Sequence, residues 1–306
     1  MQVRIANAGS LDGELVAGPF GPARRILTLP VAEILAQYRK KCGADISHCF
    51  SNIATVDLNE CQVTGYRFWR PQSIAADEKA YRILSAAWKK YYRHDRWEYK
   101  FVRKALRRAD NVLEIGCGRG FFLKSIESRV AGAKGLEFNQ EAIANKATKF
   151  EILPMTVEEY AARFPASMDA VCSFQVLEHV TDPRSFLEAA IACLKPGGRL
   201  FLSTPNMESA MLLNREDAFD LPPHHMGQFS KDVYVALAKL FGLELKQVRI
   251  EHRRSAAADT VTDATGQSLL FRAMRALNHV MMDMVFWILS EPGNNILVTL
   301  QKPERQ

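Results

Sequence analysis

The chain has 306 residues, of which 48% are hydrophobic and 24% are charged. This composition is typical of a globular protein and excludes a disordered or fibrous chain. The formal net charge of +6 favours anionic partners, but it is too small to establish nucleic-acid binding.

The cysteine pattern bears on metal binding and on redox compartment. No C-x-x-C pair occurs among the six cysteines, so neither a zinc ribbon nor a redox motif is supported, and we predict no metal. We interpret the cysteines as buried free thiols, which is typical of a protein in the reducing cytoplasm. A metal held by Cys42, Cys49 and Cys61 is the alternative. The N-terminus lacks the pattern of a signal peptide.

The first part of the chain has few regular signals. Residues 1–29 contain several Gly and Pro without a clear period, which predicts an irregular N-terminal arm. Residues 30–108 are predicted to form a basic and aromatic extension that is partly helical, with a first helix over 31–41. The segment 65–71 interleaves aromatic and basic residues, and we favour packing against the main domain over stacking on a sugar or base.

Residues 79–108 read as helical and strongly basic. They hold eleven Lys or Arg against Asp95 and Glu98, a local net charge of +9. We favour a solvated basic face over an aromatic packing face. The alternatives are a surface that attracts the phosphate groups of a substrate, and nucleic acid, for which no recognition motif is present.

From residue 111 the pattern alternates between strand and helix, which predicts parallel strands with right-handed crossovers in a doubly wound sheet. The expected strands cover 112–115, 133–138, 151–155, 169–174 and 199–203, and the helices 121–130, 140–149 and 183–194. A helix over 231–241 with Ser230 as its N-cap and a strand over 243–250 follow.

A long apolar helix is expected over 267–289, before a last strand over 296–300. Arg272, Arg275 and Asp283 interrupt this helix, so it lacks the uncharged run that a membrane span needs. We expect a lid or packing helix on the substrate side. The alternatives are, in order, a homodimer contact and attachment to a membrane surface.

The stretch Asn111–Phe121 is the most informative part of the sequence. It predicts a buried strand, a glycine turn and a helix, which together form a candidate cofactor-binding loop. Such a turn binds either a dinucleotide such as NAD or S-adenosylmethionine. The dinucleotide fingerprint is G-x-G-x-x-G. Here the glycines run G-x-G-x-G, and bulky Phe121 occupies the third fingerprint position. Glu137, placed 21 residues after Gly116, suits the ribose hydroxyls of either cofactor.

Four motifs together favour S-adenosylmethionine. Val112–Gly120 (VLEIGCGRG) resembles the first motif of class I S-adenosylmethionine-dependent methyltransferases. The segments 173–180 (SFQVLEHV), 194–200 (LKPGGRL) and 203–206 (STPN) are similar to their later motifs in order and spacing. The resemblance implies a Rossmann-like α/β fold with a seven-stranded, mostly parallel sheet whose last strand is antiparallel. The methyltransferase domain would cover 109–302, with an insertion at 255–292.

A second resemblance concerns the N-terminal part. The pattern Cys61-x-x-x-Gly65-Tyr66-x-Phe68-x-x-Pro71, followed later by Trp97-Glu98-Tyr99, is similar to methyltransferases of cell-surface polysaccharide pathways. Some of those relatives carry a zinc-binding cysteine set, whose paired spacing this chain lacks.

The first resemblance also implies the cofactor site. Glu114, Gly116 and Gly118 would line the methionine part, with Cys117 between them. Glu137 would bind the ribose, and Gln175 would face the cofactor from the end of the fourth strand. The residues placed near the adenine are Phe138, Met155 and Thr156. Glu178 and His179 follow in the strand-to-helix turn, where they either pin the turn or serve the site.

Transfer of the methyl group to a hydroxyl would leave S-adenosylhomocysteine and needs a base for the hydroxyl proton. His224 and His225 are the first candidates, because they lie in the loop after the fifth strand, and His179 is the second.

The sequence therefore predicts a methyltransferase for a small molecule or a glycan precursor, which could carry phosphate. The alternatives are an RNA or protein methyltransferase and a non-catalytic S-adenosylmethionine-binding protein.

Overall fold

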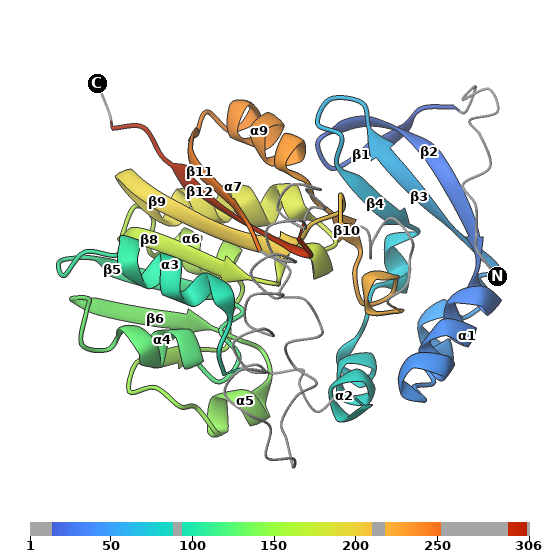
Figure 1. Ribbon diagram of the computed structural model, residues 1–306, viewed down its shortest axis with the longest axis horizontal. Coiled ribbons are helices and arrows are strands. Elements are labelled where there is room, and N and C mark those ends of the chain that lie inside the picture. Colours follow the sequence, from blue (N-terminus) through green and yellow to red (C-terminus); the bar gives the residue numbers. More distant parts are fainter. Residues whose placement is uncertain (1–13, 88–93, 210–217, 252–292, 305–306) are drawn as a thin grey trace, which may run out of the picture.

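The computed structural model describes residues 14–87, 94–209, 218–251 and 293–304. Two β-sheets organise this part of the chain (Figure 1). One has seven strands and is flanked by helices, and the other has five strands and lies at the N-terminal end of the molecule.

The seven-stranded sheet has the strand order β11-β12-β9-β8-β5-β6-β7. Its strands are β5 (Asn111–Ile115), β6 (Gly132–Leu136), β7 (Glu151–Leu153), β8 (Met168–Phe174), β9 (Leu194–Pro205), β11 (Glu244–Ile250) and β12 (Asn295–Gln301). β12 runs antiparallel to both of its neighbours, whereas the pairs among β5 to β9 are all parallel. The predicted Rossmann-like α/β fold with an antiparallel last strand is confirmed.

Helices cover both faces of this sheet, because alternate residues of each strand point to opposite sides. Val112 packs with the helices α3 and α4, whereas its neighbour Leu113 packs with α6, α7 and α9. The bounds of these helices are α3 (Trp97–Ala105), α4 (Phe121–Ile126), α6 (Val157–Arg163), α7 (Pro183–Cys193) and α9 (Lys231–Leu240), and α5 spans Gln140–Ala144. α4 and α5 are shorter than expected, and α6 was not predicted. Ser230 caps α9 as predicted.

The five-stranded sheet corrects the sequence prediction for the N-terminal part. Its antiparallel strands are β1 (Val16–Gly18), β2 (Gly21–Pro30), β3 (Thr55–Cys61), β4 (Arg67–Arg70) and β10 (Gly227–Gln228), in that order. The expectation of an irregular arm is therefore wrong for residues 16–18 and 21–29. The extension over 30–108 is partly helical, as expected, but it also contributes β3 and β4, which were not predicted. In β2 the register shifts between Arg25 and Leu27, which breaks the alternation that sequence periodicity would detect.

Helices close one side of the five-stranded sheet. They are α1 (Val31–Cys42) and α2 (Glu78–Ala87), with the short 3-10 turns η1 (Ser47–Phe50) and η2 (Gln72–Ile74). The first helix matches the prediction within one residue. The expected helix over 79–108 is interrupted, because residues 94–96 are not helical between α2 and α3.

The aromatic residues of segment 65–71 are packing residues. Tyr66, Phe68 and Trp69 are 1–3% exposed, and Tyr66 and Phe68 belong to the same hydrophobic core as the seven-stranded sheet. Trp69 packs instead in the core beneath the helices of the N-terminal part, so all three aromatic rings are buried in packing contacts. The interpretation of this segment as a packing strap is confirmed.

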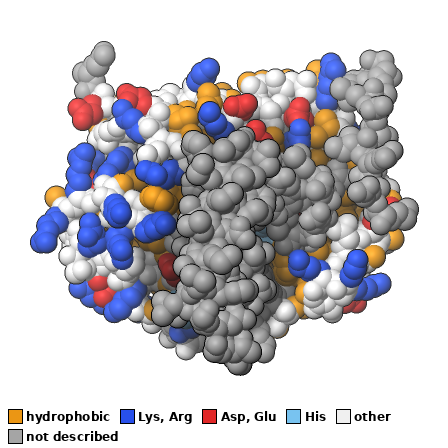
Figure 2. Space-filling model, in the orientation of Figure 1, with side chains coloured by type: hydrophobic (Ala, Val, Ile, Leu, Met, Phe, Trp, Pro, Cys, Tyr) orange, Lys and Arg blue, Asp and Glu red, His pale blue; other side chains and the backbone are white. Residues whose placement is uncertain are grey.

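The described part of the basic segment presents most of its charges to solvent. Figure 2 shows Lys and Arg side chains gathered on the side of the molecule where α3 lies in Figure 1. Val102 and Leu106 are buried, whereas the cations in this helix and just after it are exposed, namely Lys100, Arg103, Lys104, Arg107 and Arg108. This arrangement is the basic face over a packing face that we favoured.

No helix within the described ranges is long and apolar enough to cross a membrane. The predicted helix over 267–289, with its proposed lid or homodimer contact, lies outside those ranges.

Candidate active site

The glycine turn connects β5 to α4 at the carboxyl edge of the seven-stranded sheet. Gly116, Gly118 and Gly120 have φ values of +68°, +52° and +74°, in the left-handed region that favours glycine. The backbone N–H groups of Gly116 and Cys117 donate to the carbonyl of Leu136, at the end of β6, over 2.9 and 3.1 Å. The turn is therefore held against the neighbouring strand end.

Glu137 follows β6 directly, and its carboxylate is fixed by three backbone donors. One oxygen accepts from Gly118 N at 2.8 Å, and the other accepts from Phe138 N and Asn139 N at 2.9 Å. A carboxylate offers about four lone-pair positions, so it can accept further hydrogen bonds while it pins the turn.

A solvent-open cleft of ≈540 Å³ lies over the glycine turn. Of the nine residues predicted to bind the cofactor, six line it: Glu114, Gly116, Cys117, Gly118, Glu137 and Gln175. The sequence analysis did not anticipate the other lining residues, which are Arg96, Tyr99, Arg119, Phe121 and Phe174. Arg96 and Tyr99 come from the basic segment, so that segment contributes directly to this cleft.

Three predicted cofactor residues lie outside the set that lines the cleft. Phe138 is 62% exposed beside Glu137, and Met155 packs partly buried against the core. Thr156 has a structural role, because it forms a capping box with Glu159 at the start of α6.

The Thr156→Ala variant should lose about 1 kcal/mol of unfolding free energy, because a capping hydrogen bond disappears. Thr156→Ser keeps the hydroxyl and should retain most of the stability. Urea unfolding followed by circular dichroism compares the two. Equal stability of wild type and Thr156→Ala would contradict the capping role.

Glu114 contributes a buried carboxylate to the cleft. It is 2% exposed, and burial raises the pKa of its carboxyl well above the usual range, while the charge of Arg96 opposes this shift. Its Oε2 has no hydrogen-bond partner among the described residues. A buried acceptor without a partner is costly, so this oxygen suits a cationic or N–H group of a ligand.

Gln175 lies at the end of β8 with a φ of +56°, which is uncommon for a residue with a side chain. Its backbone N donates to Ser203 O at 2.8 Å, and its Nε2 donates to Ser203 Oγ at 2.9 Å. The Ser203 hydroxyl in turn donates to the buried Glu98 at 2.7 Å. This chain of hydrogen bonds fixes Gln175 in a strained conformation that faces the cleft.

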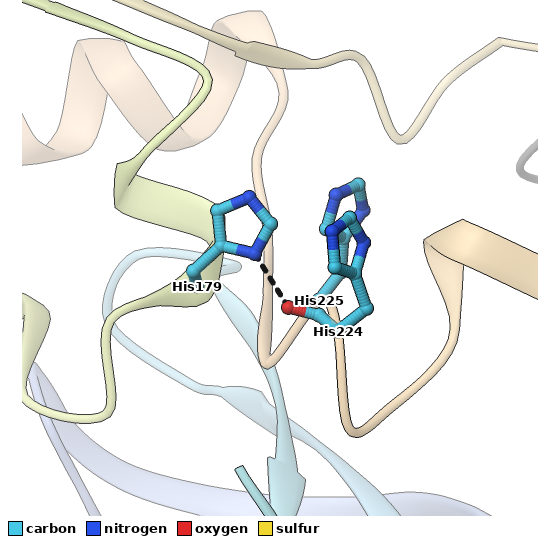
Figure 3. Close-up of side chains that lie close together, drawn as sticks. All are labelled: His179, His224 and His225. Carbon is cyan, nitrogen blue, oxygen red and sulfur yellow. Dashed lines mark hydrogen bonds between the residues drawn. The ribbon is translucent and has the colours of Figure 1, made fainter. Parts of the chain in front are cut away.

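The three predicted catalytic histidines form one cluster (Figure 3). His179 comes from the 3-10 turn η3 (Leu177–His179) after β8, and His224 and His225 come from the loop after β9. Their ring centroids lie 4.5–4.8 Å apart. None of them is among the residues that line the cleft over the glycine turn.

The surroundings of the cluster differ from one ring to the next. Burial lowers the pKa of His179 to about 3 and that of His224 well below its usual range. Both are therefore neutral, and weak proton acceptors, at neutral pH. His225 Nδ1 lies 3.2 Å from Asp220 Oδ1, a carboxylate that can orient the ring.

Glu178 lies beside this cluster and is almost fully buried. Burial raises the pKa of its carboxyl to about 7, while the charges of His225 and Arg96 oppose the shift. Arg96 lines the cleft and also acts electrostatically on His179. The cleft and the histidine cluster are therefore electrostatically connected.

The fold and the cleft define a doubly wound α/β protein with a glycine turn at the carboxyl edge of its sheet, an arrangement typical of proteins that bind nucleotide cofactors. A family model described as "Methyltransferase domain" matches residues 89–248, just over half of the chain. The chain therefore belongs to the class I S-adenosylmethionine-dependent methyltransferase family. Its cofactor is S-adenosylmethionine. The unpartnered Glu114 oxygen and the Glu137 carboxylate are hydrogen-bond acceptors, which is compatible with the ammonium and hydroxyl donors of that molecule.

Two curated relatives carry the name ubiquinone biosynthesis O-methyltransferase. The chain is 36% identical to the Erwinia tasmaniensis protein over 105 residues, which are 32% of this chain and 43% of the relative. It is 26% identical to the Thiobacillus denitrificans protein over 215 residues, 65% and 87% of the two chains. The chain thus spans less than half the length of the first relative. Neither name concerns glycans.

Solved structures agree with the fold. A chain from the complex of the Haloferax volcanii Trm112 methyltransferase activator with its methyltransferase aligns over 74% of this chain and 96% of its own. The TM-score is 0.50 and the sequence identity is 19%. This similarity supports the fold alone.

Proposed function

We propose that this chain transfers the methyl group of S-adenosylmethionine to a hydroxyl oxygen of a small molecule. The main support is the cleft in which Glu114 and Glu137 flank the glycine turn, with a buried acceptor suited to the cofactor's amino group. The relatives named ubiquinone biosynthesis O-methyltransferase support oxygen as the methyl acceptor.

The chain's own residues would bind and orient the reactants. The sulfonium of bound S-adenosylmethionine supplies an activated methyl group. Glu114 would accept hydrogen bonds from the amino group, and Glu137 would accept from the ribose hydroxyls. Gln175, fixed by Ser203, would face the reacting end of the cleft. Catalysis then depends on holding the acceptor oxygen in line with the methyl group and excluding water.

The acceptor hydroxyl has to lose its proton as the oxygen–methyl bond forms. Among the three proposed bases, His179 and His224 accept a proton poorly, because burial depresses their pKa values. His225, paired with Asp220, is the strongest of these candidates.

The cofactor is tested by isothermal titration with S-adenosylmethionine and, separately, with NAD. We expect saturable binding of S-adenosylmethionine only, because Phe121 replaces the third glycine of the dinucleotide fingerprint. Tighter binding of NAD would overturn the proposal.

The acceptor is tested by transfer of a labelled methyl group. The panel contains hydroxylated aromatic precursors of the ubiquinone type, nucleotide sugars, lipid-linked glycans and RNA. We expect transfer to a hydroxylated small molecule. The exposed cations of α3 favour a phosphate-bearing one, and transfer to a nucleotide sugar would support the glycan-precursor prediction. Transfer to RNA alone would overturn the proposal, and cofactor binding without transfer would favour a non-catalytic role.

A further inference from the structure

The histidine cluster has the composition of a metal site. One ring nitrogen from each of His179, His224 and His225 lies within 4.8 Å of the others, and His224 and His225 are buried. Neutral imidazole is the commonest protein ligand for transition metals. Three histidines with a carboxylate nearby form a donor set that zinc and related ions accept.

The hydrogen bonds of the three rings set their tautomers. His179 Nδ1 lies 2.6 Å from the carbonyl oxygen of His224, and His224 Nδ1 lies 2.9 Å from that of Phe219. His225 Nδ1 faces the Asp220 carboxylate. Carbonyl and carboxylate oxygens only accept, so each Nδ1 carries the hydrogen and each Nε2 carries the lone pair. Metal-binding histidines are oriented by this kind of outer hydrogen bond.

Glu178 gives an independent observation that points to a cation. Its side chain is 1% exposed, and neither carboxylate oxygen has a hydrogen-bond partner among the described residues. Oε1 lies 3.9 Å from His179 Nε2. A buried carboxylate of this kind is costly unless it is neutralised or binds a cation.

We propose that His179, His224, His225 and Glu178 bind one divalent first-row transition-metal ion. The rings of His224 and His225 are stacked at 22° in this structure, so they would turn to direct both nitrogens at one ion. The ion would link η3 to the loop after β9. It would occupy the lone pair of His225, so with the metal bound this ring would not act as the base.

Cobalt and zinc are the probes for this site. The full-length protein, freed of metal with a chelator, is titrated with Co²⁺ and then with Zn²⁺. We expect one Co²⁺ per chain with a visible ligand-field absorption band, which Zn²⁺ abolishes by competition. We also expect Zn²⁺ to raise the melting temperature. If the wild-type protein shows neither the absorption band nor the rise in melting temperature, the proposal is wrong.

Variants locate the ion. His224→Ala and Glu178→Gln should each raise the Kd for Co²⁺ by at least about tenfold, with far-UV circular dichroism reporting whether each is folded. His48→Ala is the matched control, because His48 belongs to a second, more exposed group with Cys49 and Asp77. Unchanged Co²⁺ binding in His224→Ala, or its loss in His48→Ala, would overturn the assignment. None of these measurements uses S-adenosylmethionine. A failure of the proposed metal site can therefore be distinguished from a failure of the proposed methyl transfer.

Discussion

Glu137→Ala should raise the Kd for S-adenosylmethionine roughly 100-fold, which corresponds to about 3 kcal/mol. The carboxylate is expected to accept charge-assisted hydrogen bonds from the ribose. It also holds the N–H groups of Gly118, Phe138 and Asn139, so its loss loosens the glycine turn as well. Isothermal titration measures the change.

Glu141→Ala is the matched control for this variant. Glu141 lies four residues further on, in the first turn of α5, and its side chain is exposed outside the set of cleft residues. Its loss should leave the cofactor Kd within about twofold of wild type, because exposed charges away from a ligand contribute little. Equal affinity of the Glu137 variant and wild type would remove Glu137 from the cofactor site.

Gly116→Ala should destabilise the chain by about 3 kcal/mol or more and abolish measurable cofactor binding. An added Cβ would lie 2.4 Å from Val176 Cγ2, and the φ of +68° is strained for alanine. Relief of the clash would move the loop that carries Gln175 away from the turn. Thermal unfolding and titration with S-adenosylmethionine report the two effects.

Gly43→Ala separates backbone strain from the clash. Gly43 ends α1 with the same φ of +68°, but an added Cβ would meet no atom within 4 Å. This variant should lose only about 1 kcal/mol and bind the cofactor normally. A Gly116→Ala protein as stable as Gly43→Ala, with normal binding, would show that the turn tolerates a side chain.

The methyltransferase core could be predicted from the sequence because its signals are local. The glycine turn, Glu137 and the alternation of strands and helices all follow from short segments. The number of strands in the seven-stranded sheet and the antiparallel direction of β12 followed from the family resemblance, whereas the order of the strands was not predicted. Met155 and Thr156 were expected at the adenine edge, whereas the structure places Thr156 as the cap of an unpredicted helix.

The N-terminal sheet and the histidine cluster depend on contacts between distant segments. β4 pairs with Gly227–Gln228, more than 150 residues away, and a two-residue strand has no periodicity to detect. His179 and His224 are separated by 45 residues, and their proximity depends on how the loops after β8 and β9 fold together. The sequence did not identify Arg96 as a cleft residue, because the pattern of a basic segment does not show which of its cations turns toward a site.

The pairing of β10 with β4 bears on protein engineering. The family match begins at residue 89, yet the loop that carries His224 and His225 continues into β10, which is the fifth strand of the N-terminal sheet. A chimera that transplants only the matched region into a relative would leave β10 without its pairing edge and Phe229 without Tyr66. A transplant of the histidine loop between relatives would therefore have to include the N-terminal sheet as well.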